Sequence, residues 1–181
     1  MKKLIAILMA AVMVLTFAAC SKAPVAEENT TEAEVIENVE ETSEAASATG
    51  SVAQTLAAEF KAIAATETDA QVIAEALASS AAVSAIGAAA MPVEPGFLTG
   101  FDNAEITGFD AGVMFAPMIG TIPFVGYVFT LADGTDADAF VKTLEDNANL
   151  RWNICTMADE MVSAVEGNVV MFVMAPMSFD A

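Results

Sequence analysis

Apolar residues recur at helical spacing at the start of the region that follows Gly50. They are three or four positions apart, so they share one face of an amphipathic helix. The members of this stripe are Val52, Leu56, Phe60 and Ile63. A second stripe begins after Thr68 and Asp69, either of which can cap a helix. We expect the second helix to reach about Ala90, because the prolines that follow cannot continue its hydrogen-bond ladder.

The composition changes after Pro95 to glycine, aromatic and β-branched residues, which favour strands. The segments 104–109, 113–118 and 124–131 predict three strands. The last of these carries apolar residues on both faces, so we expect it in the interior of a sheet.

The stretch "ADGTDADAF" predicts a turn followed by a helix that Thr135 or Asp136 caps and that ends near Asn149. The segments 160–165 and 169–175 then predict a hairpin. Together these elements predict an α+β fold. We expect an antiparallel or mixed sheet of about four to five strands with helices packed on one face, preceded by an α-helical segment.

The first 19 residues have the pattern of a signal peptide, with two lysines, an apolar run and a small pair at Ala18 and Ala19. Cys20 follows at once, which resembles the bacterial lipobox, although Phe17 stands where that pattern usually has leucine. The resemblance implies that Cys20 is acylated. An ordinary secreted chain cut after Ala19 is the alternative.

Residues 20–50 are rich in glutamate and contain no aromatic residue. Such a segment buries too little apolar surface to offset its ordering entropy, so we expect a disordered tether. An acidic binding arm is the alternative. Residues 51–181 are long enough for one domain. The resulting hypothesis places this domain on the outer face of the cytoplasmic membrane, held through lipid on Cys20.

The charge of the chain argues against binding to nucleic acid. The formal net charge is −19, and loss of residues 1–19 leaves four cations against 25 carboxylates, a net charge of −21. Phosphate backbones repel such a chain.

The sequence also argues against an enzyme. The chain contains no histidine, no recognisable nucleophile motif and no loop that cradles phosphate. We therefore expect no catalytic residues, no cofactor and no metal. The acidic pairs at 145–146 and 159–160 leave a carboxylate-dependent hydrolase as the weakest hypothesis. Cys155 is interpreted as a small buried apolar residue.

Two segments are candidates for binding a ligand or a partner. A proline-flanked carboxylate precedes two phenylalanines in "MPVEPGFLTGF", and the only tryptophan follows the only arginine in "LRWNICT". Tryptophan and arginine often anchor interfaces. The candidate residues are Glu94, Phe97, Phe101, Arg151 and Trp152. Burial of the aromatic side chains in the core is the alternative for both segments.

Two possible metal sites have simpler explanations. Asp133, Asp136 and Asp138 could ligate calcium, but a turn and a helix cap explain the same residues. Met171, Met174 and Met177 have the spacing of copper(I) sites. Positions three apart on a strand face opposite sides, so core packing is the better interpretation.

The chain resembles the small uncharacterised lipoproteins of clostridial, gut-type Firmicutes. The resemblance rests on the "FAAC" anchor, the glutamate-rich tether and a terminal strand like "GNVVMFVMAP", and it covers most of residues 51–181. It implies the compartment and the fold. That family has no assigned activity, so the resemblance implies no site.

We expect a membrane-anchored binding module for a small molecule or a protein, with a structural or assembly factor of the cell envelope as the alternative.

Overall fold

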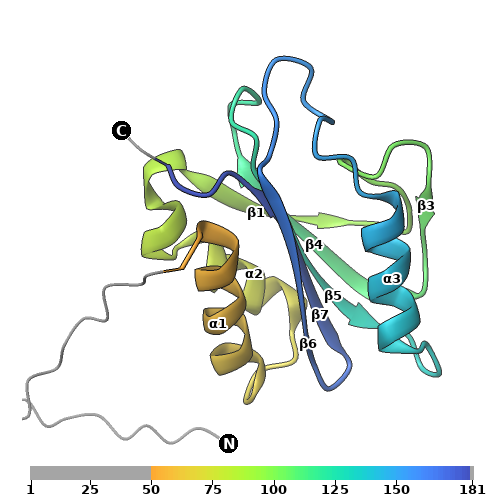
Figure 1. Cartoon of the computed structure of the whole chain (residues 1–181). Helices are drawn as coiled ribbons and strands as arrows, with labels where there is room; N and C mark the ends of the chain where they lie inside the picture. Colours follow the sequence, from red (N-terminus) through yellow and green to blue (C-terminus); the bar gives the residue numbers. More distant parts are fainter. Residues whose placement is uncertain (1–49, 180–181) are drawn as a thin grey trace, which may run out of the picture. The chain divides into compact units, whose positions relative to one another are not determined.

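A five-stranded antiparallel sheet with the order β1-β4-β5-β7-β6 forms the centre of the fold (Figure 1). A computed structural model describes residues 50–179. The predicted signal peptide, Cys20 and nearly all of the predicted tether lie outside the described residues. The elements are α1 (Val52–Ala64), α2 (Ala70–Ala78), a 3-10 helix (Ala81–Ile86), β1 (Ala88–Val93), β2 (Gly96–Phe97), β3 (Glu105–Ile106), β4 (Phe109–Pro117), β5 (Val125–Leu131), α3 (Ala137–Asn147), β6 (Glu160–Glu166) and β7 (Val169–Ala175). The predicted α+β class is confirmed.

Side-chain caps fix where the helices begin. The Asp69 carboxylate accepts hydrogen bonds from the backbone N–H groups of Gln71 and Val72, at 2.8 and 3.2 Å. The Asp136 carboxylate accepts one from Ala139 at 2.8 Å. These bonds satisfy N–H groups that have no partner within the helix. Of the two alternatives predicted for each helix, the cap is therefore the aspartate and not the threonine.

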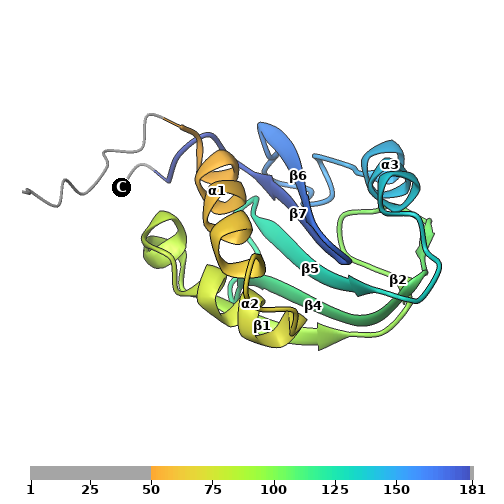
Figure 2. The same ribbon diagram turned by 90° about the horizontal axis from the view of Figure 1, so that it is seen from below.

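Helices cover both faces of the sheet, so the expectation that all of them pack on one face is wrong. Successive residues of β7 alternate between two apolar cores, because strand side chains point to opposite faces. Met171 and Val173 pack with α1 and α2, whereas Phe172 and Met174 pack with α3. Figure 2 shows the strands between these two sets of helices. Since β5 and β7 are apolar on both sides, each side requires its own cover.

The second helix ends at Ala78 and not near Ala90 as predicted. A 3-10 turn follows, Gly87 adopts a left-handed conformation with φ of 59°, and Ala88–Val93 forms β1. This strand pairs with β4 at the edge of the sheet. An edge strand can contain Pro92 because the backbone on its outer side has no partner strand and therefore needs no N–H donor there. The alanines at the start of β1 favour a helix, but pairing with β4 outweighs this preference.

The hairpin of β6 and β7 and the interior position of β5 are as predicted. Gly167 and Asn168 join the two hairpin strands, and Gly167 has the positive φ of 59° that such turns require. β5 lies between β4 and β7, with Tyr127 opposite Phe172 and Val128 opposite Met171. Met171 and Met174 are fully buried on opposite faces, which confirms core packing for these two methionines, whereas Met177, beyond the end of β7, is 54% exposed.

One added methyl group at the centre of the sheet should reduce the stability of the domain strongly. A Cβ at Gly126 would lie 2.2 Å from the ring of Phe115. We expect Gly126→Ala to lower the free energy of unfolding by about 1–3 kcal/mol, because the ring must leave its position. Chemical unfolding followed by circular dichroism measures the change. Gly120→Ala is the matched control, since a Cβ there meets nothing within 4 Å. Equal stability of the two variants would contradict this account of the core.

Candidate functional site

The predicted binding residues occupy different environments. Phe101 is fully buried in the core beneath α3, with its ring centroid 5.6 Å from that of Tyr127 and 5.1 Å from that of Phe172. The prediction that Phe101 contacts a ligand is therefore wrong, because the loop turns its ring into the core. Glu94 and Phe97 are exposed.

The second predicted segment, at 151–152, lies at the surface. Arg151 is exposed, and Trp152 is half-buried with part of its surface against the core. The single tryptophan is thus neither a core residue nor a fully exposed one.

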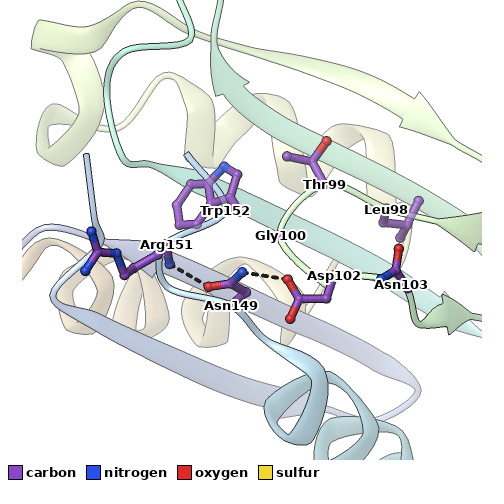
Figure 3. A pocket seen from close by; sticks show the side chains of 8 residues that line it. All are labelled: Leu98, Thr99, Gly100, Asp102, Asn103, Asn149, Arg151 and Trp152. Atoms are coloured by element: carbon purple, nitrogen blue, oxygen red, sulfur yellow. Dashed lines mark hydrogen bonds between the residues drawn. The ribbon is translucent and has the colours of Figure 1, made fainter. Parts of the chain in front are cut away.

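Hydrogen bonds join the loop after β2 to the segment after α3. The backbone N–H of Asn149 donates to the carbonyl of Gly100 at 2.8 Å. The Asn149 side chain donates through Nδ2 to Asp102 Oδ1 at 2.6 Å and accepts through Oδ1 from the Arg151 N–H at 2.8 Å (Figure 3). The structure therefore brings the two predicted segments together, with Asn149 as the link.

The two segments enclose an open hollow of about 410 Å³. Figure 3 shows the side chains around it, with the indole of Trp152 beside the backbone at Thr99 and Gly100. The lining residues are Leu98, Thr99, Gly100, Asp102, Asn103, Asn149, Arg151 and Trp152. Of the residues predicted from sequence, Arg151 and Trp152 line the hollow, and Glu94 and Phe97 do not.

Sequence reasoning missed Asn149, Asn103 and Thr99 as lining residues. Asn149 and Asp102 are 47 positions apart, and their hydrogen bond depends on where two loops cross. Asp102 was missed as well, although the glycine-rich stretch that it ends was a local signal of an unusual backbone conformation. It has a φ of 46°, the one positive value recorded for a non-glycine residue among 50–179. Aspartate tolerates this conformation better than most residues.

The floor of the hollow is held by the buried phenol of Tyr127. Its hydroxyl donates to the carbonyl of Thr99 at 2.8 Å and lies 3.4 Å from the Met114 sulfur. Burial raises the pKa of the Tyr127 phenol, so it remains a neutral donor. Gly100 lies close by with a φ of 94°, and a Cβ there would meet the Met174 methyl at 2.3 Å. The loop can follow this path because residue 100 has no side chain.

A second, smaller hollow of about 180 Å³ also has Trp152 in its wall. Its other walls are mainly apolar and include Met91, Met114, Ile122 and Phe124. Trp152 therefore contributes to a polar hollow and to an apolar one.

Neither Cys155 nor the acidic turn at 133–138 lines the polar hollow. Cys155 is exposed, so its interpretation as a buried apolar residue is wrong, because the connection after α3 passes over the surface there. Asp136 caps α3, as the simpler explanation of the acidic turn required. Within residues 50–179, no group of three or more acidic or cysteine side chains is arranged to hold a metal ion.

Three of the four acidic residues in these pairs make ordinary surface contacts, whereas Glu160 is partly buried and its Oε1 has no hydrogen-bond partner. Asp146 forms an ion pair with Lys142 at 2.9 Å, and Glu145 accepts a hydrogen bond from Ser163 at 2.8 Å. Asp159 accepts one from the Met177 N–H at 3.0 Å. Among the described residues, Asp102 is the one carboxylate that lines the polar hollow.

No family model matches the chain, and no curated protein or solved structure is significantly similar to it. The resemblance to clostridial lipoproteins therefore stays a prediction. Among residues 50–179, no helix has the length and apolar character needed to cross a bilayer.

The position of Tyr127 predicts that its phenol ionises only when the domain unfolds. Because burial raises its pKa, the neutral phenol contributes stability that is fully present below about pH 10 and is lost as the pH rises further. Tyr127 is the only tyrosine, so tyrosinate absorbance reports on it alone. We expect this absorbance to appear together with the loss of circular dichroism. Tyrosinate formation near pH 10 in a folded domain would contradict the placement.

Loss of the same hydroxyl should also be measurable at neutral pH. Tyr127→Phe leaves the Thr99 carbonyl without this donor. We expect its free energy of unfolding to fall by about 1 kcal/mol, the usual contribution of one such bond. Urea unfolding at pH 7 measures the change, and an unchanged midpoint would show that the bond does not hold the loop.

Proposed function

We propose that this protein is a lipid-anchored binding module of the cell envelope that takes a small polar ligand in the hollow beside Trp152. The observation that carries the proposal is the joining of two distant loops by Asn149, around the only tryptophan and the only arginine of the chain. An unligated loop crossing would need no such concentration of exposed polar groups.

The polar groups of the hollow retain capacity for a ligand. Among residues 50–179 the one ion pair is between Lys142 and Asp146, so the Arg151 guanidinium is available as a charged donor. Asn149 uses one hydrogen of its amide on Asp102, which leaves the other hydrogen and the second carboxylate oxygen of Asp102. Donors and acceptors therefore stand on both sides of the hollow.

The indole of Trp152 adds a flat apolar surface with an N–H at its edge. A ligand that suits this arrangement has one flat apolar face and several hydroxyl, amide or carboxylate groups around it. Sugar residues and small peptides have this chemistry. A few convergent polar groups around an aromatic wall are typical of binding sites.

The hollow gives little support to a hydrolase. Hydrolysis by carboxylates alone requires an acid and a second carboxylate across the scissile bond. Among the described residues, Asp102 is the only carboxylate at this site, and the carboxamide of Asn149 already holds one of its oxygens.

The anchor in this proposal rests on the sequence of the first 20 residues. An apolar run that ends in small residues before Cys20 supports acylation of that cysteine. Acyl chains confer membrane affinity in proportion to their buried CH₂ groups. The proposed location is the outer face of the cytoplasmic membrane.

The ligand proposal is tested by calorimetric titration of the domain with a panel of monosaccharides, amino sugars, amino acids and dipeptides. We expect saturable binding of at least one compound. Asn149→Ala should weaken it by about tenfold or more, which corresponds to a loss of about 1.4 kcal/mol. Asn168→Ala, in the β6–β7 turn at the other end of the sheet, is the matched control and should bind normally. Binding that Asn149→Ala leaves unchanged would place the site elsewhere.

The anchor is tested separately by expressing the full chain and its Cys20→Ser variant in a bacterial host. We expect the unaltered chain to partition into the detergent phase and to show an acylated N-terminal cysteine by mass spectrometry. The variant should remain in the aqueous phase. An unmodified thiol at residue 20 in the native protein would refute lipidation.

A further inference from the structure

Two hydrogen-bonded connections at one end of the sheet each expose large apolar side chains. In the β4–β5 connection, Met118 and Ile119 are 74% and 70% exposed to solvent. In the α3–β6 connection, Ile154 and Met157 are 93% and 50% exposed. We call these four residues the apolar tip. Figure 1 shows both connections, teal and blue, at the upper end of the drawing. Soluble domains seldom leave several large apolar side chains uncovered on neighbouring connections.

Hydrogen bonds hold the two connections against each other. The Asn153 side chain donates to the carbonyl of Gly120, and the Thr156 hydroxyl donates to the carbonyl of Thr121 at 3.1 Å. Both bonds use side chains of the second connection and backbone of the first. The apolar tip is therefore a defined surface.

The charge of this end differs from that of the rest of the chain. Residues 111–132 contain no charged side chain, and residues 147–158 contain only Arg151, in a chain with 25 carboxylates. The acidic residue nearest in sequence to the four tip residues is Asp159, whose carboxylate accepts a hydrogen bond from the Met177 N–H. Asp102 is bonded to Asn149 in the neighbouring hollow. An apolar surface bordered by an arginine and a tryptophan is the combination favoured where a bilayer meets water.

The first helix, α1, also begins at this end of the sheet. The Val52 N–H donates to the carbonyl of Met177, which follows the end of β7. β4 and β7 each pair antiparallel with β5, so their C-terminal ends lie on the same side. A lipid anchor at Cys20 would thus connect to the domain at the end that carries the apolar tip.

From these observations we propose that the apolar tip contacts the lipid bilayer and orients the domain on it. The argument from the chain's entry point rests on the proposed anchor, whereas the contact itself depends on the four exposed side chains. The proposed anchor would keep the domain near lipid, and this favours a bilayer over a protein partner. A second copy of this chain is the competing occupant.

The test uses residues 21–181, which contain both apolar cores and lack Cys20. This choice separates the proposal from lipidation and from ligand binding. The protein is mixed with vesicles of phosphatidylcholine and phosphatidylglycerol. Trp152 is the only tryptophan and lies two positions from Ile154, so its emission reports on the contact.

We expect sedimentation of the domain with vesicles, a blue shift of Trp152 emission, and quenching by brominated lipids. Physiological salt should preserve or strengthen binding, because the attraction is apolar and the domain is acidic. The variant Met118→Ser, Ile119→Ser, Ile154→Ser should bind about tenfold more weakly or worse, since each substitution removes buried apolar area. Circular dichroism checks that this variant is folded.

The matched control is Val72→Ser, Phe97→Ser, which alters two exposed apolar residues away from the tip. It should bind vesicles normally. Absence of vesicle binding, or equal loss in both variants, would overturn the proposal. Concentration-dependent dimers without lipid that only the tip variant abolishes would assign the surface to a second copy instead.

Discussion

Burial of the central strands on both faces is the constraint on which the rest of the structure depends. β5 and β7 carry apolar side chains on each side, and such strands cannot leave either side in water. α1 and α2 cover one side, while α3 covers only part of the other. The remaining cover comes from the loops at 98–104 and 148–158, whose Phe101, Leu150 and Trp152 pack in the same core as Tyr127. The proposed site exists because these loops are needed to complete a core.

The loops are fixed by few but specific bonds. Tyr127 reaches out of the core to the Thr99 carbonyl, and Asn149 joins Gly100, Asp102 and Arg151. The Tyr127 phenol is already protonated at physiological pH, and burial raises its pKa further, so this donor is retained as the pH rises toward 10. The same connection that supplies Asn149 and Trp152 continues to Ile154. The polar hollow and the apolar tip therefore belong to one supported segment.

Much of the fold could be predicted because local chemistry specifies it. Asp69 and Asp136 sit where an amphipathic stripe begins, so their role as caps follows from the neighbouring residues. Gly167 fixes the β6–β7 turn, and the two-sided apolar pattern of 125–131 places that strand inside the sheet. The prediction failed at Ala88–Val93, where alanine favours a helix but the open edge of β4 offers a strand partner. It failed also for α3, because periodicity shows that a helix has an apolar face and does not show which face of the sheet it covers.

By itself the sequence narrowed each helix cap to two neighbouring residues, determined the hairpin and the α+β class, and offered two of the residues that line the hollow, Arg151 and Trp152, as candidates. Each of these depends on residues within a few positions of one another. Only the tertiary structure decided that Phe101 points inward, that Cys155 is exposed, and that Asn149 bonds to Asp102. These outcomes depend on contacts between segments far apart in the chain, where the energy of packing and pairing exceeds any local preference.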